Sequence, residues 1–234
     1  MKIAYFSTGV PDPMQGGSGI LNYYFLHYLL DNGHKVKAFF RVNDAFLEKH
    51  STLKHLPPLV SKGLVYEFVN ENKRRWPLKF GLNFLFQQQQ YFVCKKIIDE
   101  HNNELMTFDV CFSLDLGWAL ALKEINLPKI CILADPLHGR FKYGAHPCYL
   151  TPRGLLHIMR KLSIRSLPKW YPDLLRGFDD KRNILGCWAP QEVDQYKNWG
   201  VQVRHFRWFC PSANIVHKHT PKEGKLVALH LGSL

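Results

Sequence analysis

The stretch Lys2-Ile3-Ala4-Tyr5-Phe6-Ser7-Thr8-Gly9 indicates a short apolar strand that runs into a glycine-containing loop. A helical pattern follows at about 19–32 and ends at Asn32-Gly33, a typical helix stop signal. The next apolar run, 35–41, is again typical of a strand. This order is the opening of an α/β domain.

The same alternation continues along the chain. Further strands are predicted at 64–69, 108–114, 129–133, 183–188 and 202–206, and helices at 78–101, 117–126 and 191–199. Continuous apolar strands that alternate with helices predict a Rossmann-like parallel sheet with helices on both faces. The basic stretch 135–182, rich in Pro and Gly, interrupts the alternation and is expected to be an excursion.

The last ten residues, Lys-Leu-Val-Ala-Leu-His-Leu-Gly-Ser-Leu at 225–234, form another apolar run before a Gly-Ser turn. One interpretation is the first strand of a second, truncated domain, which gives a first domain at 1–220 and a linker with that strand at 221–234. The other is an ordinary strand at the edge of the first sheet.

Composition limits the classes of protein. The 234 residues are 46% hydrophobic, with a net charge of +12 and a pI near 9.4, so a folded core and anionic partners are expected. The six cysteines are widely spaced without a Cys-x-x-Cys pair, which favours a reducing cytosol. Pro11, Asp12 and Pro13 interrupt any N-terminal apolar stretch. We expect a cytoplasmic protein that touches a membrane at most from outside.

The first loop carries the clearest binding signal. It ends in Gly16-Gly17-Ser18-Gly19 at the start of the predicted helix, where backbone N–H groups and the helix N-terminus favour an anion. The run matches neither the Gly-x-Gly-x-x-Gly fingerprint nor a P-loop. It either contacts a ligand or is only a turn.

Two acids follow predicted strands. In one interpretation, Asp115 and Asp135 bind a sugar hydroxyl or act as a base. In the other, each only caps the following helix or turn. His138 is a further catalytic candidate, and Arg140 in the same loop is a candidate ligand contact. The spacing of the loop histidines fits no metal motif, so no metal is expected.

A basic segment at 151–182 contains a possible amphipathic helix. Its apolar face would hold Leu155, Ile158, Met159 and Leu162, opposite His157, Arg160, Lys161 and Arg165. Such a helix either lies on an anionic membrane or packs its apolar face on the core.

Three stretches together resemble the N-terminal domain of a GT-B glycosyltransferase of the glycogen-synthase-like, family 4 type. They are 1–19 with its glycine loop, 108–115 with its strand and acidic residue, and 187–200 with Cys-Trp-Ala-Pro-Gln-Glu at its start. The resemblance implies twin Rossmann-like domains, with the acceptor held by this half. The nucleotide-sugar would be held mainly by a second domain with the family's Glu-x7-Glu motif, and no metal is needed. The family often has a histidine where this chain has Ala134.

From this resemblance we expect the acceptor-binding domain of an enzyme that moves a sugar from a nucleotide-sugar to a sugar or lipid-linked acceptor. Without its second domain it would be inactive. Two alternatives are a nucleic-acid-binding protein, favoured by charge but without a helix-turn-helix, RNP or zinc-finger pattern, and a non-catalytic adaptor. A longer natural reading frame with a second α/β domain would favour the transferase.

Overall fold

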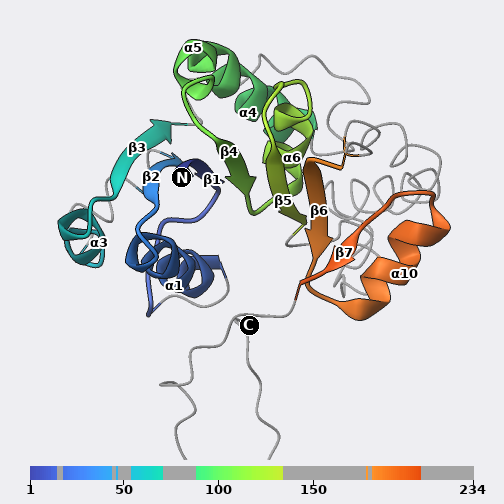
Figure 1. The fold of residues 1–234 in the computed structure, drawn as a ribbon, viewed down its shortest axis with the longest axis horizontal. Helices are drawn as coiled ribbons and strands as arrows, with labels where there is room; N and C mark the ends of the chain where they lie inside the picture. Colours follow the sequence, from blue (N-terminus) through green and yellow to red (C-terminus); the bar gives the residue numbers. More distant parts are fainter. Residues whose placement is uncertain are drawn as a thin grey trace, which may run out of the picture.

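The computed structural model describes residues 1–14, 18–43, 46, 54–70, 88–133, 178 and 181–206, and every structural statement below concerns these residues. They form a seven-stranded sheet in the order β3-β2-β1-β4-β5-β6-β7, with every pair of neighbours parallel. Figure 1 shows this sheet running across the molecule. The strands are β1 (Lys2–Ser7), β2 (Lys35–Val42), β3 (Val65–Asn70), β4 (Val110–Ser113), β5 (Lys129–Leu133), β6 (Asn183–Cys187) and β7 (Arg204–His205).

Helices cover both faces of the sheet, as the sequence predicts for a Rossmann-like fold. On one face, the strands form a hydrophobic cluster with α1 (Ser18–Asp31) and α3 (Pro57–Ser61). On the other face, the strands form a second hydrophobic cluster with α4 (Gln88–Glu100), α5 (Asn102–Leu105), α6 (Leu116–Leu122) and α10 (Pro190–Asn198). None of these helices has the length and apolar character that crossing a bilayer requires.

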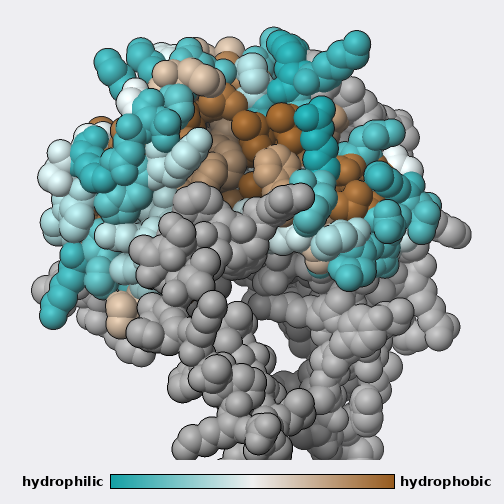
Figure 2. All heavy atoms as spheres, turned by 60° about the horizontal axis from the view of Figure 1, so that its bottom comes forward, coloured by the Kyte–Doolittle hydropathy of each residue, from teal (hydrophilic) through white to brown (hydrophobic). Residues whose placement is uncertain are grey.

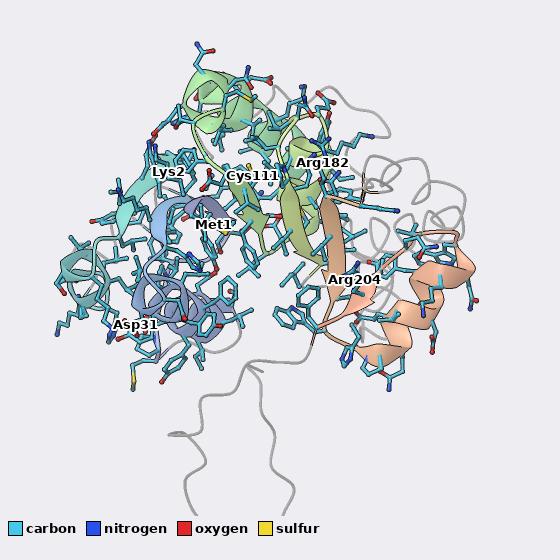
Figure 3. The ribbon with its side chains drawn as sticks, viewed as in Figure 1. Met1, Lys2, Asp31, Cys111, Arg182 and Arg204 are labelled. Carbon is cyan, nitrogen blue, oxygen red and sulfur yellow. The ribbon has the colours of Figure 1, made fainter. Side chains whose placement is uncertain are left out.

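The two clusters follow from the alternation of side chains along each strand. On β1, Tyr5 faces the α1 side, where its ring stacks on Phe112 with 5.2 Å between ring centroids. Phe6 faces the opposite side and packs against Trp118 of α6, with 5.0 Å between the ring centroids. Cys111, labelled on β4 in Figure 3, belongs to the same side as Phe6. Both faces of β1 are therefore buried.

The seven strands predicted between residues 2 and 206 are confirmed, with shifted ends. The last one is shorter than expected, Arg204–His205 instead of 202–206, and α6 ends at Leu122 instead of residue 126. Gly33, the expected stop signal, has a φ of 75°, and Gly200 after α10 has a φ of 78°, which glycine adopts without strain. The short helices α3 and α5 were not predicted.

Several predictions lie outside the described residues. They are the first part of the helix predicted at 78–101, the basic amphipathic helix, most of the excursion at 135–182 and the strand at 225–234. The proposed domain boundary near residue 220 stays a prediction for the same reason.

Candidate functional site

The order of the strands reverses between β1 and β4. From β1 the chain passes through α1 to β2 on one side, whereas β4 pairs on the other side with the register Ile3↔Val110. In open α/β sheets, ligands bind beyond the carboxyl ends of the strands at such a place. We call the carboxyl ends of these two strands, residues 7–9 and 113–115, the switch point.

Turning the bottom of Figure 1 forward brings the carboxyl ends of β4 and β5 toward the viewer. Among the described residues on the face seen then, hydrophobic ones gather in the middle and hydrophilic ones lie on either side (Figure 2). Apolar and polar side chains of the described residues thus adjoin on this face.

A polar contact spans the switch point. The Thr8 hydroxyl donates a hydrogen bond to Oδ2 of Asp115, whereas Oδ1 of Asp115 accepts one from the backbone N–H of Trp118 at 2.9 Å. Asp115 is the N-cap of α6 and has an extended backbone, as such caps do. The capping interpretation of Asp115 is confirmed, and its role as a base stays a prediction.

Burial raises the pKa of the Asp115 carboxyl above its usual value, because desolvation disfavours the ionised form. The Arg41 guanidinium and the backbone N–H groups of Trp118 and Gly117 act in the opposite direction. Arg41 lies on β2 and is only 4% exposed, and its Nη1 is 3.4 Å from Sγ of Cys94. The switch point thus has a desolvated acid whose ionised form is favoured by a buried cation.

Several backbone N–H groups of the first loop already donate hydrogen bonds within the loop or to α1. The N–H of Gly9 donates to Oγ of Ser7 at 3.1 Å, that of Asp12 to the Gly19 carbonyl at 3.1 Å, and that of Met14 to Oδ1 of Asp12 at 2.8 Å. The loop's two prolines have no N–H. Backbone contacts to an anion would therefore come mainly from the start of α1.

Of the predicted site residues, the structure describes Ser18, Gly19 and Asp115. Ser18 is the exposed first residue of α1 and Gly19 is buried behind it. Gly9 approaches this helix so closely that a Cβ on it would lie 2.8 Å from Oγ of Ser18. The loop after β1 and the start of α1 thus form one unit next to Asp115.

The other predicted site residues, Gly16, Gly17, Asp135, His138 and Arg140, lie outside the described residues. Within the described ranges, no group of three or more His, Cys, Asp or Glu residues is arranged to hold a metal ion.

Sequence reasoning placed Thr8 at a strand end where ligands bind, but it missed two other residues of the site, Asn22 and Arg41. Asn22 carried a usable signal, because a polar residue within an apolar helical pattern demands a partner. Arg41 carried a weaker one, since it falls within an otherwise apolar strand.

Comparisons with known proteins found distant structural likenesses only. No protein-family model matches the sequence, and no curated protein matches it. Among solved structures, the glycosyltransferase UGT89C1 of Arabidopsis thaliana, crystallised with UDP, aligns over 90% of this chain and 49% of its own, with 11% identity and a TM-score of 0.45. UGT73P12 of Glycyrrhiza uralensis aligns over 87% of this chain and 48% of its own, with 12% identity and a TM-score of 0.39.

An oxidoreductase is similar to a comparable degree. The enoyl-acyl carrier protein reductase of Bacillus cereus, solved with NADP+, aligns over 80% of this chain and 71% of its own, with 8% identity and a TM-score of 0.39. The chain spans about half the length of the two glycosyltransferases. The assignment of an α/β Rossmann-like fold rests on the parallel sheet and its helices, not on these distant likenesses.

Proposed function

We propose that this chain is the acceptor-side domain of a glycosyltransferase that moves a sugar from a nucleotide-sugar to an acceptor. The observation that carries the proposal is the polar pair Thr8 and Asp115 at the switch point, beside the glycine-bearing start of α1. The sequence resemblance to GT-B enzymes of the family 4 type supports the same assignment.

The residues divide between two tasks. Gly16, Gly17, Ser18 and Gly19 supply backbone N–H groups at a helix N-terminus, which suits the phosphates of the donor. Asp115 faces the acceptor, where a carboxylate accepts a hydrogen bond from a sugar hydroxyl. A raised pKa makes Asp115 a better proton acceptor from that hydroxyl than an ordinary aspartate.

Asp135, His138 and Arg140 belong to this proposal as further contacts on the acceptor side. They follow β5, whose carboxyl end lies next to that of β4. The proposed chemistry proceeds without a metal, because the glycine run and the basic residues would balance the phosphate charge. An anionic membrane surface would suit a lipid-linked acceptor.

A nucleic-acid-binding protein is the second candidate, because the net charge of +12 attracts any polyanion. The two proposals differ in where the ligand binds. A nucleotide-sugar should perturb the switch point and the start of α1, whereas a duplex should perturb basic residues over a wider surface.

The deciding experiment is an NMR titration of the ¹⁵N-labelled chain with UDP, UDP-glucose, NADPH and a short DNA duplex. We expect UDP and UDP-glucose to shift the amide signals of Thr8, Ser18 and Gly19. The dissociation constant should be near ~1 mM, about 4 kcal/mol of binding free energy, since the second domain would supply the rest. NADPH should cause smaller shifts. An unchanged switch point at ~10 mM UDP, together with tight duplex binding, would support the second candidate instead.

Transfer itself is to be assayed in the product of the full natural reading frame. There, Asp115→Asn should lower kcat/KM by roughly a hundredfold if Asp115 assists proton removal. Asp99→Asn is the matched control, because Asp99 is an exposed carboxylate on α4 that pairs with Lys95 at 3.5 Å. Equal activity of the two variants would mean that Asp115 is only a cap.

A further inference from the structure

Asn22 is a buried amide inside α1, with 0% of its surface exposed. Its Oδ1 accepts a hydrogen bond from the Tyr5 hydroxyl at 2.5 Å. Its Nδ2 donates to Oγ of Ser7 at 2.8 Å and to the carbonyl of Gly9 at 2.9 Å. A buried amide is costly unless its groups are paired, and here the partners all lie on β1 or directly after it.

These bonds fix the backbone on both sides of Thr8. Ser7 is the last residue of β1 and also accepts the N–H of Gly9 at 3.1 Å. The N–H of Gly9 is thus held by Ser7 and its carbonyl by Asn22. Thr8, between the two, has little freedom to turn, and its hydroxyl meets the Asp115 carboxylate.

We propose that Asn22 is a positioning residue of the switch point: by holding Ser7 and Gly9, it keeps the Thr8 hydroxyl against the Asp115 carboxylate and so maintains the ligand site. Asn22 touches neither Asp115 nor the proposed ligand directly and acts through Thr8. The ligand part of this inference rests on the proposed glycosyltransferase function. The part that concerns Thr8 and Asp115 stands without it.

A purely structural role would make a different prediction. If Asn22 only filled space, a leucine of similar volume would change stability and nothing else. If Asn22 positions the loop, Asn22→Leu should also change the local opening of Gly9 and the ionisation of Asp115. Both can be measured by NMR without any ligand.

The control is Leu29→Ala, a cavity variant on the same helix, because Leu29 is buried but makes no part of the loop network. We expect Asn22→Leu to speed amide exchange of Gly9 by about tenfold or more, through local opening. It should also raise the pKa of Asp115, because a carboxylate that loses a hydroxyl donor ionises less readily. Thr8→Val should raise that pKa in the same way, and Leu29→Ala should leave it unchanged.

UDP binding completes the test. Asn22→Leu should weaken UDP binding roughly fivefold to tenfold relative to Leu29→Ala, because Asn22 holds Gly9, which lies against Ser18 at the start of α1, where the phosphates are proposed to bind. If the unaltered chain binds no UDP, the proposed function fails, whereas amide exchange and the Asp115 titration still decide the positioning role. If Asn22→Leu does not fold, Ser7→Ala takes its place, since it removes the acceptor of the Gly9 N–H. An Asp115 titration and Gly9 exchange that match those of Leu29→Ala would overturn the inference.

Discussion

Two substitutions of Asp115 separate its charge from its hydrogen bonds. Asp115→Ala removes the cap on the Trp118 N–H and the acceptor of the Thr8 hydroxyl. Loss of a cap costs about 1 kcal/mol, and loss of the second hydrogen bond about 1 kcal/mol more. Asp115→Asn keeps one oxygen as the acceptor of the Trp118 N–H, and its amide NH2 can donate to the Thr8 hydroxyl oxygen in place of the lost acceptor. Asparagine also caps helices as well as aspartate does. We therefore expect alanine to lower the free energy of unfolding by about 2 kcal/mol and asparagine by less than about 0.5 kcal/mol.

The pH dependence has a definite sign. The pKa of Asp115 is raised in the folded state, so the folded chain binds the proton more tightly than the unfolded chain does. Asp115 therefore contributes stability below the unfolded value of about 3.9, and this contribution is lost as the pH rises through the folded pKa. Asp115→Asn cannot ionise, so its stability relative to the unaltered chain should improve from acidic to neutral pH.

Urea denaturation followed by circular dichroism at several pH values measures both effects. A loss of about 2 kcal/mol in Asp115→Ala corresponds to a melting temperature lower by ~4–8 °C for a domain of this size. If asparagine destabilises the chain as much as alanine does at neutral pH, the attraction between Arg41 and the carboxylate outweighs desolvation. Desolvation as the cause of a raised Asp115 pKa would then be refuted.

Three further predictions concern the loop and the core. Gly9→Ala should lower the free energy of unfolding by about 1 kcal/mol, because the new methyl group would collide with the Ser18 side chain. Adding Ser18→Ala should restore part of this loss in thermal melts, and no rescue would mean that another contact is responsible. Burial raises the pKa values of Cys111 and Cys131 to about 12, so both should resist thiol labelling at pH 8 until urea unfolds the chain, as mass spectrometry would show. Trp118→Ala should cost about 3–5 kcal/mol in urea titrations, and a loss below ~1 kcal/mol would mean that α6 repacks easily.

Most strands were predictable because they are apolar runs of a length that suits a sheet buried on both faces, whereas β7, Arg204–His205, is exposed and was predicted too long. The helix α3 was not, since Pro57-Pro58 is typical of a turn, yet a proline is tolerated in the first turn of a helix. The four-residue helix α5 is too short to show a period. Local sequence thus predicts long elements and misses single turns.

The site was predictable only where it depends on local sequence. Asp115 precedes an apolar helix, and capping follows from that position alone. Its contact with Thr8 requires β1 and β4 to be neighbours, which no local pattern reveals. Arg41 is buried because β2 is covered on both faces and an acid lies nearby, and both conditions are tertiary.

The pairing of β1 with β4 also has a kinetic consequence. The Lys2 N–H bonds to Asp109 at one end of this pairing and Thr8 bonds to Asp115 at the other, and each contact joins residues 107 positions apart. The β1, α1 and β2 unit closes a much shorter loop, so its entropy loss is smaller and it can form earlier. The pairing of β1 with β4 forms only after the longer loop between them has closed. A partly folded chain would then possess its first parallel pair while still lacking the place where a ligand could bind.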